Sequence, residues 1–160
     1  MKTYLQLLRA KSWVKNGFLF LPAIFSLKLL DEQLMLHLIL GFLVFSLSSS
    51  FIYLHNDLND APQDALHPRK QNRPIASGKV SKNKAFLISS FVLVAALALF
   101  YISALPLTFL WLVVSYLTVN LLYVFWLKNV ALSNAKQKFY NWMPAQKNTD
   151  RCLLPTVFLF

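Results

Sequence analysis

The chain has 160 residues, of which 57% are apolar and 15% aromatic, and its formal net charge is +10. The apolar residues come in long blocks, which is typical of membrane proteins and argues against one soluble domain. The single cysteine, Cys152, excludes an internal disulfide framework and a cysteine-rich zinc site. We therefore predict an all-α fold class, a multi-pass membrane helical bundle with about four transmembrane helices.

The first segment, residues 1–16, has four cationic residues and no acidic one. Leucines and Trp13 are interspersed with the cations, and this pattern predicts a short amphipathic helix at the membrane surface. The cationic residues are Lys2, Arg9, Lys11 and Lys15.

Four apolar segments follow, each interpreted as a transmembrane helix. The first is short and contains Pro22 and Lys28, so we expect residues on either side to extend it. Serines near the end of the second are expected to let helices approach closely and hydrogen-bond to each other. The predicted spans are 17–33, 34–53, 85–104 and 107–127.

The lysines and arginines predict the orientation of the chain in the membrane. Fifteen of the sixteen lie in the segments 1–16, 54–84 and 128–151. By the positive-inside rule, these segments and therefore the N-terminus are cytoplasmic. The same distribution accounts for most of the positive charge, so nucleic-acid binding is disfavoured.

Three aspartates, Asp57, Asp60 and Asp64, follow the second apolar segment directly. On a helix, these spacings place the three carboxylates within an arc of about 60°, with Asn56 just beside it. Like charges held this close repel each other, and hard oxygen ligands of this kind suit Mg²⁺. The alternative is a solvated helix end whose acids pair with nearby lysines.

Basic residues suited to phosphate oxygens come next, among them His67, Lys70 and Arg73. Carboxylates that hold a metal beside bases that hold phosphate are what a Mg-diphosphate site needs. Pro62 lies between the second and third aspartates and lacks an amide donor. We therefore predict a helix end followed by a bent turn rather than regular helix as far as Asp64.

These residues resemble the first aspartate-rich motif of the UbiA superfamily of intramembrane prenyltransferases. An N-terminal motif is similar to that of the decaprenyl-phosphate phosphoribosyltransferase-like branch of this superfamily. The resemblance covers about residues 5–130. The matching residues are Asn56-Asp57-x-x-Asp60-x-x-x-Asp64, His67-Pro68-x-Lys70-x-x-Arg73-Pro74-Ile75-Ala76-Ser77-Gly78 and Arg9-x-x-x-Trp13-Val14-Lys15-Asn16.

The resemblance implies a helical membrane fold in which two aspartate-rich motifs face each other and hold Mg²⁺ with a diphosphate. It implies transfer of a 5-phosphoribosyl group from 5-phosphoribosyl 1-diphosphate to a polyprenyl phosphate acceptor, in the inner membrane of a bacterium, for cell-wall biosynthesis. The alternatives are a prenyl diphosphate donor with an aromatic or lipid acceptor, and a non-catalytic membrane remnant. The implied residues are Asp57, Asp60 and Asp64 for catalysis, Asn56, Asp57, Asp60 and Asp64 for the metal, and Lys15, Asn56, His67, Lys70 and Arg73 for the substrate.

The family's second aspartate-rich motif is missing from this sequence, and the apolar pattern ends abruptly after Lys128. We interpret residues 131–160 as an atypical, frameshifted tail on a C-terminally truncated chain; a genuine cytoplasmic tail is the alternative. Half of a two-motif cavity cannot enclose a diphosphate and exclude water. We therefore expect this chain to be inactive by itself.

Overall fold

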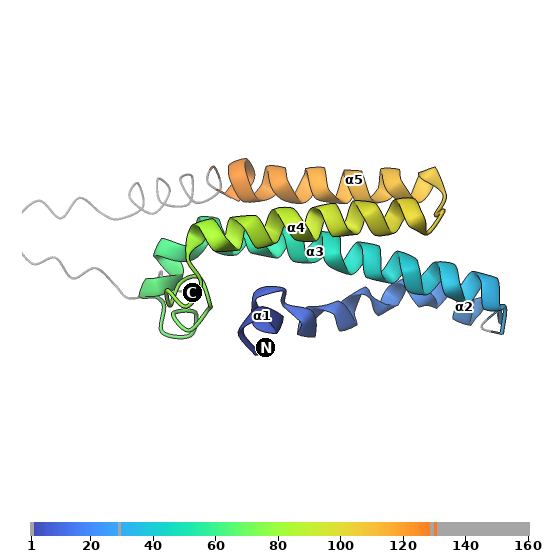
Figure 1. Cartoon of the computed structure of the whole chain (residues 1–160), viewed down its shortest axis with the longest axis horizontal. Helices are drawn as coiled ribbons and strands as arrows, with labels where there is room; N and C mark the ends of the chain where they lie inside the picture. The colour runs from blue at the N-terminus through green and yellow to red at the C-terminus, as the bar shows by residue number, and fades with distance from the viewer. Residues whose placement is uncertain (1, 29, 129, 131–160) are drawn as a thin grey trace, which may run out of the picture. The chain divides into compact units, whose positions relative to one another are not determined.

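The computed structural model describes residues 2–28, 30–128 and 130, and all the regular elements among them are helices, as predicted (Figure 1). The predicted tail, 131–160, lies outside the described residues. The chain divides into two units, Met1–Leu121 and Leu122–Phe160, and the first contains the whole candidate site. The elements are α1 (Lys2–Leu7), the 3-10 helix η1 (Ala10–Phe20), α2 (Leu21–Phe25), α3 (Glu32–Leu66), α4 (Lys82–Ile102), α5 (Leu107–Leu122) and the π-helical turn η2 (Tyr123–Leu127).

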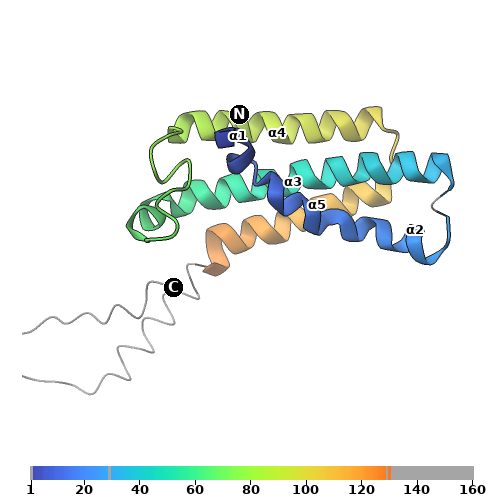
Figure 2. The same cartoon turned by 90° about the horizontal axis from the view of Figure 1, so that it is seen from below.

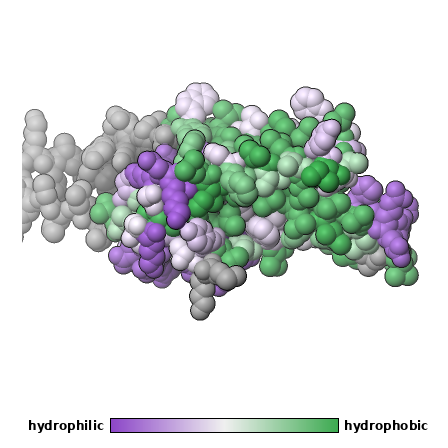
Figure 3. Space-filling view, viewed as in Figure 1, coloured by the Kyte–Doolittle hydropathy of each residue, from purple (hydrophilic) through white to green (hydrophobic). Residues whose placement is uncertain are grey.

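Three helices in the described part of the chain are long and apolar enough to cross a membrane: α3, α4 and the helix Leu107–Leu127. In the view of Figure 3, apolar residues cover the middle of the described part of the chain, and hydrophilic residues gather on either side of this apolar region. This pattern agrees with helices that cross a hydrocarbon layer and expose their polar ends to water.

The segment 17–33 differs from its prediction as a fourth continuous span. It contains the end of η1, the five-residue α2 and a turn. Leu27 has a φ of 54°, a left-handed conformation that ends a right-handed helix. Asp31 then begins α3 as its N-cap, accepting a hydrogen bond from the Leu34 amide at 3.0 Å.

Helix α3 continues through Pro62 to Leu66, so the predicted bend before Asp64 is wrong. Pro62 cannot donate to the carbonyl oxygen four residues earlier, but this removes only one helical hydrogen bond. The residues on either side of it hold the last turns in place, because Ala61 and Asp64 are both buried. Tertiary packing therefore outweighs the local cost of the proline.

Replacing Pro62 by alanine should stabilise the protein, because alanine fits the observed helix and restores the missing amide donor. Proline costs about 3 kcal/mol more than alanine inside a helix, and we expect part of this, about 1–2 kcal/mol, to be recovered. Melting in detergent, followed by tryptophan fluorescence, measures the change. Gln63→Ala, at the exposed neighbouring position, is the control. A lower melting temperature for Pro62→Ala would contradict the conclusion that Pro62 destabilises α3 locally.

A hydrophobic core links α1, α3, the loop 67–81 and the start of α4. Because side chains from the loop enter this core, the loop is held against the C-terminal turns of α3. Helix α4 lies alongside α3 in both ribbon views (Figure 2). The buried core residues are Leu7, Leu54, Ala61, Ile75, Val80 and Ala85.

Hydrogen bonds from η1 to buried serines hold the N-terminal segment on α3. The Asn16 side-chain amide donates to Ser46 Oγ at 3.0 Å and lies 3.3 Å from Ser49 Oγ. The Trp13 indole donates to Ser50 Oγ at 2.9 Å. The predicted packing role of these serines is thus confirmed, and the contacts bring the N-terminal cations to the polar end of α3.

Candidate functional site

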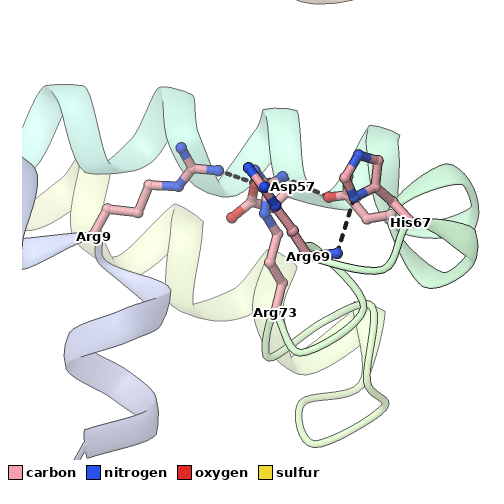
Figure 4. A network of polar contacts seen from close by, with 6 residues as sticks. Arg9, Asp57, His67, Arg69 and Arg73 are labelled. Atoms are coloured by element: carbon pink, nitrogen blue, oxygen red, sulfur yellow. Dashed lines mark hydrogen bonds and ion pairs between the residues drawn. The ribbon is translucent and has the colours of Figure 1, made fainter. Parts of the chain in front are cut away.

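The site is centred on Asp57, which is only 5% exposed, near the C-terminal end of α3. Arg9 Nη2 donates to Asp57 Oδ1 at 2.5 Å, and Arg73 Nη1 donates to the same oxygen at 3.1 Å. Figure 4 shows Arg9 and Arg73 approaching this carboxylate from different parts of the chain. A buried carboxylate is costly unless it is paired, and these two guanidinium groups supply the compensating charge.

Asp64 is the second buried carboxylate, 3% exposed and two helical turns further along α3. Its Oδ2 accepts from Arg73 Nη1 at 2.6 Å, so one nitrogen atom lies within hydrogen-bond distance of both carboxylates. The two aspartates and the arginines at positions 9 and 73 form a cluster with no net formal charge, which we call the carboxylate–arginine cluster.

The loop 67–81 positions Arg73 through its own turns and its buried residues. The Arg73 amide donates to the Lys70 carbonyl oxygen at 2.9 Å. The Val80 amide donates to the Pro74 carbonyl oxygen at 2.9 Å, and Ile75 and Val80 are buried against α3. Because these contacts fix the backbone on both sides, the Arg73 side chain is directed back toward the helix.

The structure brings together some of the predicted site residues and not others. Asp57, Asp64 and Arg73 are in direct contact. No group of three or more acidic, histidine or cysteine side chains that could hold a metal occurs in the described ranges. The complete four-residue metal set therefore stays a prediction. Outside the cluster, Lys15 is exposed on η1, while Asn56, Asp60, His67 and Lys70 are half-buried.

The two buried carboxylates, Asp57 and Asp64, pair with arginines. Arg9 was missed by sequence reasoning, although it belongs to the N-terminal motif and to a segment without acids. It lies at the break between α1 and η1, with a φ of 49°, and its guanidinium sits 4.8 Å from the centre of the Tyr53 ring. A pairing between residues 48 positions apart leaves no periodic signal in a sequence.

A cavity of about 250 Å³ opens beside the cluster. Three arginines and one aspartate line it, so its wall has a net positive charge that suits an anion. Two side-chain amides add neutral hydrogen-bonding groups. The lining residues are Gln6, Arg9, Asp57, Arg69, Asn72, Arg73 and Pro74.

The donor set of the cluster fits Mg²⁺. The ion prefers hard oxygen ligands and is usually held by one or two carboxylates together with substrate phosphates. Asp57 and Asp64 supply two carboxylates that already share one cationic partner, and the arginines beside them suit phosphate oxygens. The arrangement can hold a cation and an anion side by side.

Apolar membrane-crossing helices with a buried carboxylate–arginine cluster at one polar end define an integral membrane protein with a candidate site for a charged ligand. The model of the UbiA prenyltransferase family matches residues 19–135 of this chain. The chain belongs to this family.

Three curated relatives illustrate the similarity. Nodulation protein NoeC of Azorhizobium caulinodans is 40% identical over 79 residues, which are 49% of this chain and 25% of that protein. Decaprenyl-phosphate phosphoribosyltransferase of Mycobacterium tuberculosis is 32% identical over 129 residues, 78% of this chain and 42% of that protein. The protein of the same name in Mycolicibacterium smegmatis is 38% identical over 92 residues, 58% of this chain and 28% of that protein. The chain thus spans between a quarter and about two-fifths of the length of these relatives.

Proposed function

We propose that the protein acts as a Mg²⁺-dependent membrane transferase, or as part of one, that moves a 5-phosphoribosyl group from 5-phosphoribosyl 1-diphosphate to a polyprenyl phosphate. The observation that carries the proposal is the buried pair Asp57 and Asp64, bridged by Arg73 beside a positively charged cavity. Similarity to decaprenyl-phosphate phosphoribosyltransferases supports this choice of donor and acceptor.

In this proposal Asp57 and Asp64 hold Mg²⁺, with Asn56 and Asp60 completing the set directly or through water. When bound, the ion neutralises charge on the departing diphosphate. Phosphate oxygens are bound by the basic side chains and the Asn56 amide. The bond from the sugar C1 to the diphosphate oxygen breaks, and an oxygen of the lipid phosphate forms the new bond to C1. The basic residues proposed to bind the phosphate oxygens are Lys15, His67, Lys70 and Arg73.

The proposed orientation places the N-terminus and the loop 67–81 on the cytoplasmic side of a bacterial inner membrane. A water-soluble donor then reaches the site from the cytoplasm, and the lipid acceptor arrives along the membrane. Positive charge in this loop supports the orientation.

The donor preference can be tested by binding to the purified chain in lipid nanodiscs with and without Mg²⁺. We expect Mg²⁺-dependent binding of 5-phosphoribosyl 1-diphosphate that inorganic pyrophosphate displaces, and at least tenfold weaker binding of a short prenyl diphosphate. Transfer of labelled phosphoribose to polyprenyl phosphate, with and without the remaining part of a longer relative, tests the reaction itself.

Two other outcomes correspond to the alternatives. Tighter binding of the prenyl diphosphate would replace the proposal with a prenyltransferase that uses an aromatic or lipid acceptor. Wild-type levels of Mg²⁺ binding and unchanged cellular phenotypes for both Asp57→Asn and Asp60→Asn would indicate a non-catalytic membrane protein.

A further inference from the structure

The wall of the cavity beside the carboxylate–arginine cluster includes one arginine whose positive charge is not balanced by the carboxylates of the cluster. Arg9 and Arg73 are paired with two carboxylates. Arg69 has no ion pair with an acid in the described part of the chain, yet its side chain also lines the cavity. This excess charge lies where an anion can reach it, because Arg69 is exposed.

Arg69 is held at the first turn after α3. Its backbone amide donates to His67 Nδ1 at 3.1 Å, so the histidine fixes the turn from which the arginine side chain rises. In Figure 4, Arg69 extends beside Arg73 toward Asp57, although no hydrogen bond joins it to that carboxylate. Arg69 and Arg73 both line the cavity, and a bound anion would neutralise part of their combined positive charge.

Two neutral side chains complete this part of the wall. Gln6 comes from α1 and Asn72 from the loop, so the groups that face the cavity converge from separate parts of the chain. Each amide can donate hydrogen bonds to phosphate oxygens, and the guanidinium can donate two in parallel. A phosphate is therefore favoured here and disfavoured against the Asp57 carboxylate, which carries the same sign of charge.

The size of the cavity indicates which part of a ligand it takes. Pockets for whole small molecules are typically about 300–1,000 Å³. A cavity of about 250 Å³ suits one phosphorylated end of a donor. In the proposed function the diphosphate end lies at the carboxylates, of which Asp57 forms one side of the cavity. A phosphoribosyl diphosphate has a phosphomonoester opposite its diphosphate, whereas a prenyl diphosphate has only an apolar chain there.

We propose that Gln6, Arg69 and Asn72 form a phosphomonoester subsite that binds the 5-phosphate of a phosphoribosyl donor and selects it against prenyl diphosphates. This inference rests on the proposed function for the identity of the donor. The subsite itself rests on the cavity and on the charge of Arg69.

The test measures binding of two probes to the full chain in nanodiscs containing Mg²⁺: ribose 5-phosphate, which has only the phosphomonoester, and pyrophosphate, which has only the diphosphate. Arg69→Gln should weaken ribose 5-phosphate binding roughly tenfold or more, because a charge-assisted hydrogen bond is lost, and pyrophosphate binding less than about threefold. Lys79→Gln is the matched control, since it removes the same charge from an exposed position in the same loop outside the cavity.

Equal losses for both probes in Arg69→Gln, an equal effect of Lys79→Gln, or no ribose 5-phosphate binding by the wild type would overturn the subsite. If 5-phosphoribosyl 1-diphosphate binds the wild type and Arg69→Gln equally, the subsite fails while the proposed function stands. If ribose 5-phosphate binding depends on Arg69 but no diphosphate binds, the subsite stands and the proposed function fails.

Discussion

Replacing Arg73 by glutamine is expected to lower the melting temperature of the protein by roughly 6–12 °C. The change removes the only nitrogen that contacts both Asp57 and Asp64 within the described residues and leaves Asp64 without its guanidinium partner. Breaking a buried ion pair by removing one member costs about 3 kcal/mol or more, and a chain of this length loses about 2–4 °C for each kcal/mol. Tryptophan fluorescence during heating in detergent measures the shift.

Arg69→Gln is the matched control for this stability measurement. It makes the same substitution in the same loop, but Arg69 forms no ion pair with an acid in the part of the chain that is described. We expect its melting temperature to stay within about 2 °C of the wild type. The double variant Arg73→Gln with Asp64→Asn should recover part of the loss, because the stranded carboxylate becomes neutral. Equal melting temperatures for Arg73→Gln and Arg69→Gln would contradict a structural role of the cluster.

Asp64→Asn is expected to weaken Mg²⁺-dependent binding of pyrophosphate at least tenfold. The substitution removes one of two carboxylates proposed to hold the ion, while Arg73 keeps its contact with Asp57 and the loop keeps its place on α3. When Mg²⁺ is absent the dissociation constant should not rise, because the lost group acts on the ion and its removal takes away a negative charge beside Arg73. Titration calorimetry with and without Mg²⁺ separates the two contributions.

Asp31→Asn is the control for this binding measurement. It removes the same charge from the opposite end of α3, where the side chain caps the helix, and asparagine is an equally good N-cap residue. Its pyrophosphate affinity should equal that of the wild type. An Asp64→Asn variant with unchanged Mg²⁺ dependence, or an equal loss in Asp31→Asn, would exclude Asp64 as a ligand in the proposed metal site.

The carboxylate–arginine cluster explains how the site can stay folded when no metal ion is bound. Two buried carboxylates would repel each other without a cation, and Arg73 supplies that cation within the chain itself. Binding of Mg²⁺ in the proposed function would compete with the arginines for the same oxygens. The released guanidinium groups would then be beside the cavity, where phosphate oxygens are expected.

The sequence by itself determined the membrane class and the helices α4 and α5, because both depend on long apolar runs, which are a local pattern. The spacing of seven residues between Asp57 and Asp64 fits one side of a helix, but they share that side only because α3 continues past Pro62. The serines of α3 were also correctly interpreted as packing residues, because small hydroxyl groups suit close helix contacts.

Only the tertiary structure decided where the helices break and which charges meet. Pro62 predicted a bend, but the burial of Ala61 and Asp64 keeps α3 intact past it. The segment 17–33 was predicted as one span, but it contains the end of η1, the five-residue α2 and a turn at Leu27. Arg9 reaches Asp57 because Trp13 and its neighbours fix η1 on α3. The physical reason is that such pairings depend on contacts between distant residues, whose free energies outweigh local preferences and leave no trace in the local sequence pattern.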